Sequence, residues 1–141
     1  AAMALALGGQ AGVDVSRAVQ MALVHDLAEA LVGDLVVDGE KATRDAISRE
    51  EKQRLEGEAI VRICSGLGQA GERIRALWED YEGAASAEAR FVRDLDKLEM
   101  LCQARTYEEQ QPGVDLADFY RSTAQYNFST AICKELDQEE R

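Results

Sequence analysis

Apolar residues recur three or four positions apart along most of the chain, and this spacing constrains the fold more than any other feature. In the clearest stretch, Phe91, Leu95 and Leu98 fall on one side of a helix. A strand would need alternating polar and apolar residues, and no convincing run of that kind is present. Proline, which interrupts helices, occurs once, at Pro112. The sequence therefore predicts an all-α protein.

Helix start and stop signals divide the first quarter of the chain. Residues 1–7 should form the end of a helix that a pair of glycines beginning at Gly8 stops. A second helix should start near Asp14 or Ser16, either of which can cap it. Its apolar pattern continues without a break to Gly33, which is a natural C-terminal stop.

Five more helices are expected after a loop at residues 34–47, which have no clear period. Ser48 and Glu51 match a capping box, in which each residue satisfies an unpaired amide of the other. Ser86 is placed to cap the longest helix. The other helical patterns contain residues 74–81, 116–120 and 130–136, and residues 138–141 read as a charged tail. At 141 residues the chain fits one domain.

The charge balance excludes one class of partner. The formal net charge is -11, from 27 acidic and 16 basic residues. A protein that binds long nucleic acid needs a basic face to neutralise many phosphates, so we expect no such binding. A small phosphorylated ligand remains compatible with this charge if a metal ion supplies positive charge.

The cysteines and the first residues indicate the setting in which the protein works. Cys64, Cys102 and Cys133 are odd in number and far apart, which favours reduced thiols in a cytoplasmic protein. The apolar residues 1–7 are too few to span a membrane, and no basic region precedes them as in a signal peptide. The chain starts inside a helical pattern and without Met, so we expect that the natural protein has a further N-terminal segment.

His25 is the only histidine and is followed directly by Asp26. On a helix, His25, Asp26 and Glu29 fall on one face of an otherwise apolar segment. Burying these groups together is costly unless something pairs them, and a divalent cation accepts both nitrogen and oxygen ligands. The alternative is a structural histidine with an acidic neighbour, since acidic residues are common in this chain.

A second candidate carboxylate is Asp96, which lies between Leu95 and Leu98 at the margin of an apolar stripe. A metal shared with the histidine segment would give this carboxylate a partner. The alternative is a surface charge paired with a basic neighbour, which contributes little to stability. On the same helical wheel, Asp94 and Glu99 have wider access to solvent.

Several segments resemble the HD-domain proteins that act as 5′-deoxynucleotidases. The resemblance runs from about Met21 to Thr123 and includes MALVHDLAEALVGDL, SREEKQRLEGEAI, LWEDYEGAASAEARFVRDLDKLEM and YEEQ followed by LADFYRST. A lone His-Asp pair is a weak signal, but the order and spacing of these segments are specific. The resemblance implies a single-domain, HD-type helical bundle.

The resemblance also implies a site that binds one divalent metal ion. The family pattern is a His, an adjacent His-Asp pair and a distant Asp, and His25, Asp26 and Asp96 match its last three ligands. The first His should lie before Ala1, so the site in this chain is expected to lack one ligand. Ligands of these types do not distinguish manganese, cobalt, iron, magnesium and zinc.

The same resemblance assigns catalytic roles and a substrate. Glu29 matches a Glu that orients the attacking water or transfers its proton, and Asp34 matches an Asp at the substrate pocket. Lys52, Lys97 and Arg93 are candidates for binding the phosphate, or else solvated surface charges. The expected reaction releases phosphate from deoxyribonucleoside 5′-monophosphates, in a homodimer that does not bind membranes.

Two other functions stay open on the sequence alone. The same metal site would suit a phosphodiesterase or a nucleoside triphosphate hydrolase. A chain that kept the fold and lost the first His would instead be a non-catalytic helical interaction module.

Overall fold

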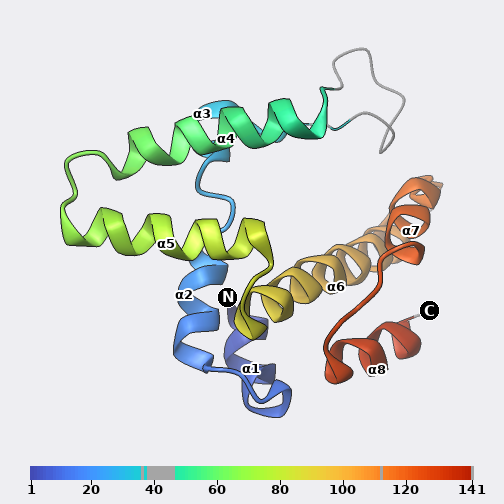
Figure 1. Ribbon diagram of the computed structural model, residues 1–141. Coiled ribbons are helices and arrows are strands. Elements are labelled where there is room, and N and C mark those ends of the chain that lie inside the picture. The colour runs from blue at the N-terminus through green and yellow to red at the C-terminus, as the bar shows by residue number, and fades with distance from the viewer. Residues whose placement is uncertain (36, 38–46, 112, 141) are drawn as a thin grey trace.

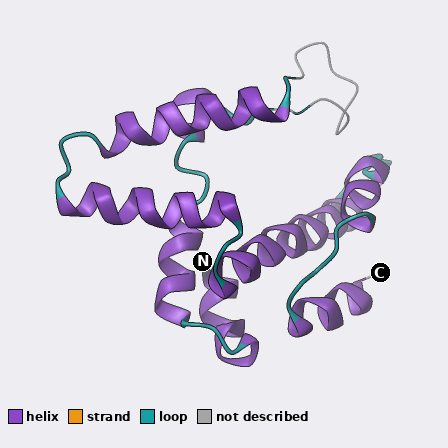
Figure 2. Cartoon of the chain, viewed as in Figure 1, coloured by secondary structure: helices purple, strands orange, loops and turns teal. Residues whose placement is uncertain are grey.

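The computed structural model describes residues 1–35, 37, 47–111 and 113–140, so most of the predicted loop at 34–47 lies outside the described residues. These parts contain helices and no named strand, and one isolated bridge joins Val37 and Ile47 (Figure 2). The all-α prediction is confirmed. The helices, labelled in Figure 1, are α1 (Ala2–Ala11), α2 (Val15–Val24), α3 (Glu29–Val32), α4 (Arg49–Cys64), α5 (Gln69–Gly83), α6 (Ala87–Gln110), α7 (Ala117–Ala124) and α8 (Ala131–Glu140).

The long helix α6 is the centre of the fold, because α1, α2, α5, α7 and α8 all pack against it (Figure 1). Its apolar stripe is fully buried, with Phe91 at 0% exposure and Leu98 at 1%. Helix α4 packs only against α3 and α5 among the described helices. A second, smaller core lies there, around Ile60 and Trp78. The site described below lies where these two parts of the molecule meet.

Helix α1 does not stop at the glycine pair but continues to Ala11 and ends at Gly12, whose φ is 70°. Gly8 is buried inside the helix, where a Cβ atom would lie 3.0 Å from Val15 Cγ2. Its role is therefore close packing of α1 against α2 rather than helix termination. At the other end of the chain, α8 runs to Glu140, so residues 138–140 are helical.

Side-chain caps begin the helices largely as predicted. Asp14, Ser48 and Ser86 each accept a hydrogen bond from the backbone N–H three residues later. The capping box is half formed, because the Glu51 carboxylate pairs with Arg54 at 2.7 Å. These caps use hydrogen bonds within one helical turn, which explains why the sequence predicted them.

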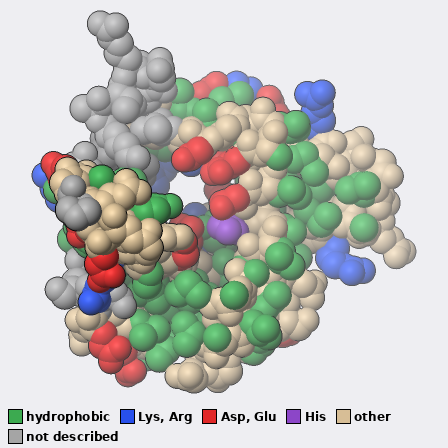
Figure 3. Space-filling view, turned by 180° about the vertical axis from the view of Figure 1, so that it is seen from behind, with side chains coloured by type: hydrophobic (Ala, Val, Ile, Leu, Met, Phe, Trp, Pro, Cys, Tyr) green, Lys and Arg blue, Asp and Glu red, His purple; other side chains and the backbone are tan. Residues whose placement is uncertain are grey.

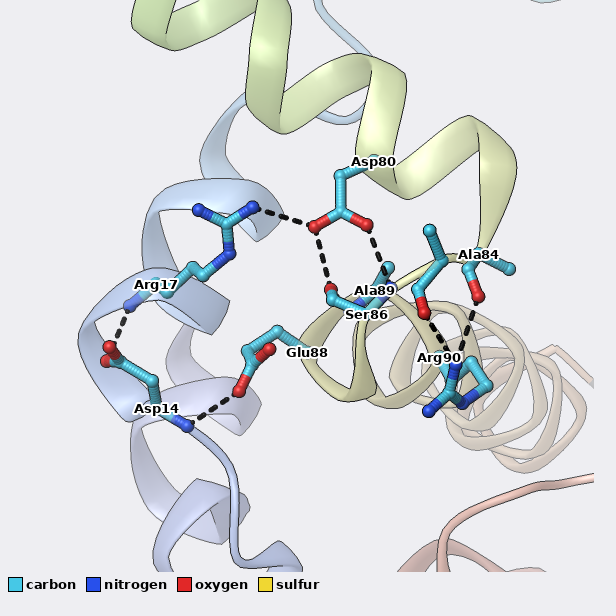
Figure 4. A network of polar contacts seen from close by, with 9 residues as sticks. Asp14, Arg17, Asp80, Ala84, Ser86, Glu88, Ala89 and Arg90 are labelled. Carbon is cyan, nitrogen blue, oxygen red and sulfur yellow. Dashed lines mark hydrogen bonds and ion pairs between the residues drawn. The ribbon is translucent and has the colours of Figure 1, made fainter.

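A polar network joins α2, α5 and α6 (Figure 4). Arg17 of α2 pairs with Asp80 of α5 at 2.8 Å, and the same carboxylate accepts hydrogen bonds from Ser86 N and Oγ. The Glu88 carboxylate accepts a hydrogen bond from Asp14 N at 2.9 Å. The network therefore fixes the first turn of α6 against α2 and α5.

Asp94 has no access to solvent, so the expectation that it faces water was wrong. Its carboxylate accepts hydrogen bonds from Tyr126 Oη and Thr130 N at 2.9 and 2.7 Å, and from both the backbone N and Oγ of Ser129. The helical wheel failed here because α6 has a second packed face, against the segment that leads into α8. Asp94 satisfies the free amides that precede that helix.

Replacing Asp94 with Ala should lower the free energy of unfolding by about 3 kcal/mol, because the buried amides of Ser129 and Thr130 would lose a charged acceptor. Urea unfolding of the variant measures this loss. The matched control is Glu99→Ala on the exposed side of α6, which should change stability by less than about 0.5 kcal/mol. Equal stability of the two variants would contradict the capping role.

Candidate metal centre

His25 occupies the end of α2 rather than the middle of a long helix. Its N–H still donates to Met21 O at 2.9 Å, but the next hydrogen bonds close tighter, three-residue turns, with Leu27 N donating to Val24 O at 3.0 Å. Helix α3 then begins at Glu29, and Gly33 ends it with a φ of 76°. The single helix predicted from Asp14 to Gly33 is thus interrupted at the His-Asp pair.

The backbone of α2 fixes the orientation of the His25 ring. Nδ1 lies 3.0 Å from the carbonyl oxygen of Ala22. Because a carbonyl oxygen only accepts, Nδ1 carries the proton that it donates there. The other ring nitrogen, Nε2, lies 3.0 Å from Asp26 Oδ2 and 3.8 Å from Asp96 Oδ1. An imidazole held by a backbone carbonyl in this way is the usual arrangement for a histidine that binds metal through Nε2.

The two carboxylates around Nε2 favour a positive charge at this nitrogen, which a proton or a metal ion can supply. Burial by itself lowers the pKa of His25, but the Asp26 and Asp96 carboxylates outweigh it and raise the pKa to about 10. Burial raises the pKa of Asp96, yet His25 and Lys97 more than compensate, so this pKa is lowered overall. Without a proton or a metal ion at Nε2, a lone pair would face two negative oxygens.

The three side chains fit a divalent metal in their donor chemistry. Nitrogen and oxygen ligands bind such ions at about 2.1 Å, so two ligands of one ion lie at most about 4.2 Å apart. The distances of 3.0 and 3.8 Å from His25 Nε2 are within this limit. Across the residues that the structure describes, no group of three His, Cys, Asp or Glu side chains has the spacing of a complete metal site. The donor types and the two distances from Nε2 thus fit a metal ion, whereas the three side chains together do not form a complete set of ligands.

Glu29 lies beside this group on α3 and is partly buried. Burial, followed by the charges of Asp26 and Asp34, raises the pKa of its carboxyl, while the Lys52 charge lowers it. Asp34 itself is exposed and comes directly after Gly33. A carboxyl group with a raised pKa is suited to exchange a proton with a bound water.

Two residues at the site make contacts that the sequence did not reveal. Tyr81 is buried, and its ring meets His25 edge-on at 5.0 Å. The guanidinium of Arg93 lies 5.2 Å from the centre of the Tyr81 ring. Arg93 precedes Asp96 by three residues on α6 and so lies on the same face. The sequence indicated Arg93 as a candidate for binding the phosphate but not its contact with Tyr81.

The two candidate lysines lie on different helices. Lys97 follows Asp96 on α6, and its charge lowers the pKa of that carboxyl. Lys52 lies on α4, with its Nζ 3.7 Å from Glu56 Oε1.

Asp and Glu side chains gather around a hollow in the surface, and the single histidine lies at its edge (Figure 3). This acidic hollow is the candidate site.

Residues 1–133 match the HD domain family. This chain belongs to that family. HD-domain proteins are metal-dependent, and in this chain two carboxylates face His25 Nε2. The family also accounts for the all-α fold.

Three relatives of this HD domain carry the name 5′-deoxynucleotidase. The human 5′-deoxynucleotidase HDDC2 is 48% identical over 111 residues, which are 77% of this chain and 51% of the human protein. The relative from Dictyostelium discoideum is 41% identical and covers 79% of this chain and 58% of its own length. The fission yeast 5′-deoxynucleotidase hdd1 is 38% identical, with 76% and 54% covered. The chain thus spans about half the length of these curated relatives.

Membrane insertion through a helix has no support in the structure. Among the described helices, none combines the length and the apolar character that crossing a bilayer requires.

Proposed function

We propose that this HD domain is the catalytic part of a metal-dependent phosphohydrolase, a 5′-deoxynucleotidase that releases phosphate from deoxyribonucleoside 5′-monophosphates. The observation that carries the proposal is His25 Nε2, held by Ala22 and facing the Asp26 and Asp96 carboxylates. The names of the relatives supply the substrate class.

His25, Asp26 and Asp96 would hold one divalent ion. Such an ion, when bound, lowers the pKa of a coordinated water and stabilises charge on a phosphoryl oxygen. We also propose that a histidine other than His25 completes the ligand set. The identity of the metal among manganese, cobalt, iron, magnesium and zinc is left to measurement.

Other side chains near the ion would transfer the proton and bind the substrate. Glu29 lies close enough to Asp26 for their charges to interact, and its carboxylate orients the attacking water and accepts its proton. Asp34, which is exposed and whose charge acts on Glu29, contacts the substrate. Lys52 and Lys97 bring positive charge to the phosphate, which would otherwise meet an acidic hollow.

Product analysis tests this proposal. The full-length protein is loaded with one kind of divalent metal. It is then incubated with each of three substrates in turn: a deoxynucleoside 5′-monophosphate, a deoxynucleoside 5′-triphosphate and a cyclic dinucleotide. Inorganic phosphate and the free nucleoside from the monophosphate are the expected products. Release of a polyphosphate from the triphosphate or opening of the diester would assign the site to one of the alternative hydrolases. No product from any substrate would favour an interaction module.

Oligomeric state and location in the cell stay predictions. A homodimer is expected, and Leu5 and Leu23, which are 68% and 67% exposed, offer apolar surface on α1 and α2 for such a contact. Light scattering on the purified protein measures the mass directly. A cytoplasmic location is expected, since reduced cysteines are typical of that compartment, and imaging of the tagged protein checks it.

A further inference from the structure

Glu56 stands out because it is a buried carboxylate on the apolar face of α4. Its exposed fraction is 6%, and it shares that face with the buried Ala59 and Ile60, one turn further along. The other buried carboxylate among the described residues is Asp94, which accepts hydrogen bonds from three residues. For Glu56, the ion pair in the described part of the chain is to Lys52, at 3.7 Å. Folding alone would favour an uncharged residue at this position.

The place of Glu56 in the fold is next to the candidate site. Helix α4 packs against α3, which carries Glu29, and against α5, which carries Glu82. Burial and the charges of Glu82 and Asp26 raise the pKa of Glu56, whereas Lys52 lowers it. Glu56 and Lys52 act in opposite directions on Glu29 as well. The charges of Lys52 and Glu56 therefore interact with those of the candidate site, Glu29 and Asp26 among them.

A phosphate monoester brings negative charge into this hollow. Lys52 is a cation on α4, the helix that packs against α3, and its charge acts on Glu29 of α3. Its side chain is 27% exposed, so it keeps access to a ligand. An ammonium on a flexible stem has many conformations, and a fixed carboxylate one helical turn away restricts them. The buried position of Glu56 supplies such a fixed point.

We propose that Glu56 is a positioning residue, which holds the Lys52 ammonium at the hollow so that Lys52 binds the phosphate group of the substrate. This inference rests on the proposed function and extends it to a residue that never contacts the substrate. The cost of burying the Glu56 charge is then offset by an ordered phosphate-binding cation.

The test measures binding of inorganic phosphate to the metal-loaded, full-length protein by calorimetry, so it does not depend on turnover. Glu56→Gln should weaken phosphate binding about 10-fold, and Lys52→Met at least as much, because each removes a charge-assisted contact or its support. The double variant should bind no more weakly than Lys52→Met. In the assay of phosphate release, Glu56→Gln should raise KM by a similar factor and change kcat less than about threefold.

The same helix offers a matched control. Arg54 and Glu58 form an ion pair with the same spacing at 2.6 Å, but on the exposed side of α4, and Glu58→Gln should leave phosphate affinity unchanged. Thermal unfolding of Glu56→Gln should be unchanged or shifted upwards, since the variant removes a buried charge.

Unchanged phosphate affinity in Lys52→Met, which alters a partly exposed side chain, would overturn the inference even if Glu56→Gln failed to fold. Multiplying effects in the double variant would also overturn it. A protein that shows the expected affinities and yet releases no phosphate from any deoxynucleotide would refute the proposed function and leave the positioning role standing.

Discussion

Asp96→Ala should lower the metal affinity of the full-length protein at least about 100-fold and remove phosphate release to the same extent. Loss of a residue that only orients a metal ligand already costs 10–100-fold. Asp96 Oδ1 lies 3.8 Å from His25 Nε2, so the variant loses one of the two carboxylates that face this nitrogen. Titration with manganese or cobalt, followed by calorimetry, measures the affinity.

The control for this prediction is Glu99→Ala, which removes a carboxylate from the exposed side of the same helix and should leave metal affinity unchanged. Because Asp96 is only partly buried, its variant should remain folded, and circular dichroism checks this. Normal metal binding by a folded Asp96→Ala protein would show that the carboxylate is an ordinary surface charge paired with Lys97.

Glu29→Gln should lower kcat by about 10²–10⁴-fold, the usual contribution of a group that moves a proton in the transition state. The amide keeps the shape of the side chain but cannot accept the proton of the attacking water. Metal affinity should fall less than about threefold, because Glu29 interacts with Asp26 through charge and is not among the groups around Nε2. Steady-state kinetics and metal titration on the same preparation separate these two effects.

Two outcomes would contradict the role of Glu29. A kcat close to that of the wild type would exclude proton transfer through this carboxylate. A parallel loss of metal affinity and kcat would instead make Glu29 a metal ligand. Glu58→Gln on α4, whose carboxylate is exposed and paired with Arg54, gives the baseline for removing one negative charge.

Much of the fold was predictable because it depends on hydrogen bonds within one helical turn. The caps at Asp14, Ser48 and Ser86 are of this kind. The extent of α1 was not, because the role of Gly8 depends on the approach of α2 rather than on its own neighbours.

The site was predictable only in part. The adjacency of His25 and Asp26 is visible in the sequence, but their contact at 3.0 Å is not, because adjacent side chains on a helix do not face each other. The approach of Asp96 to His25 was implied by the family resemblance and not by any spacing in the chain. The helical wheel predicted that Asp94 faces solvent, which was wrong. The residues that bury Asp94 lie more than thirty positions away in the sequence, so the wheel could not include them. Glu56 gave no signal, because its burial depends on three helices meeting.

Metal dependence of phosphate release is the most direct test of the proposed function. The wild-type protein is treated with a chelator, and the metal is then restored by titration. Phosphate release from a deoxynucleoside 5′-monophosphate should disappear on removal and return in proportion to the metal added, reaching its maximum at one ion per chain. Release that continues undiminished in the metal-free protein, or a protein that binds no divalent ion at His25, would contradict the account.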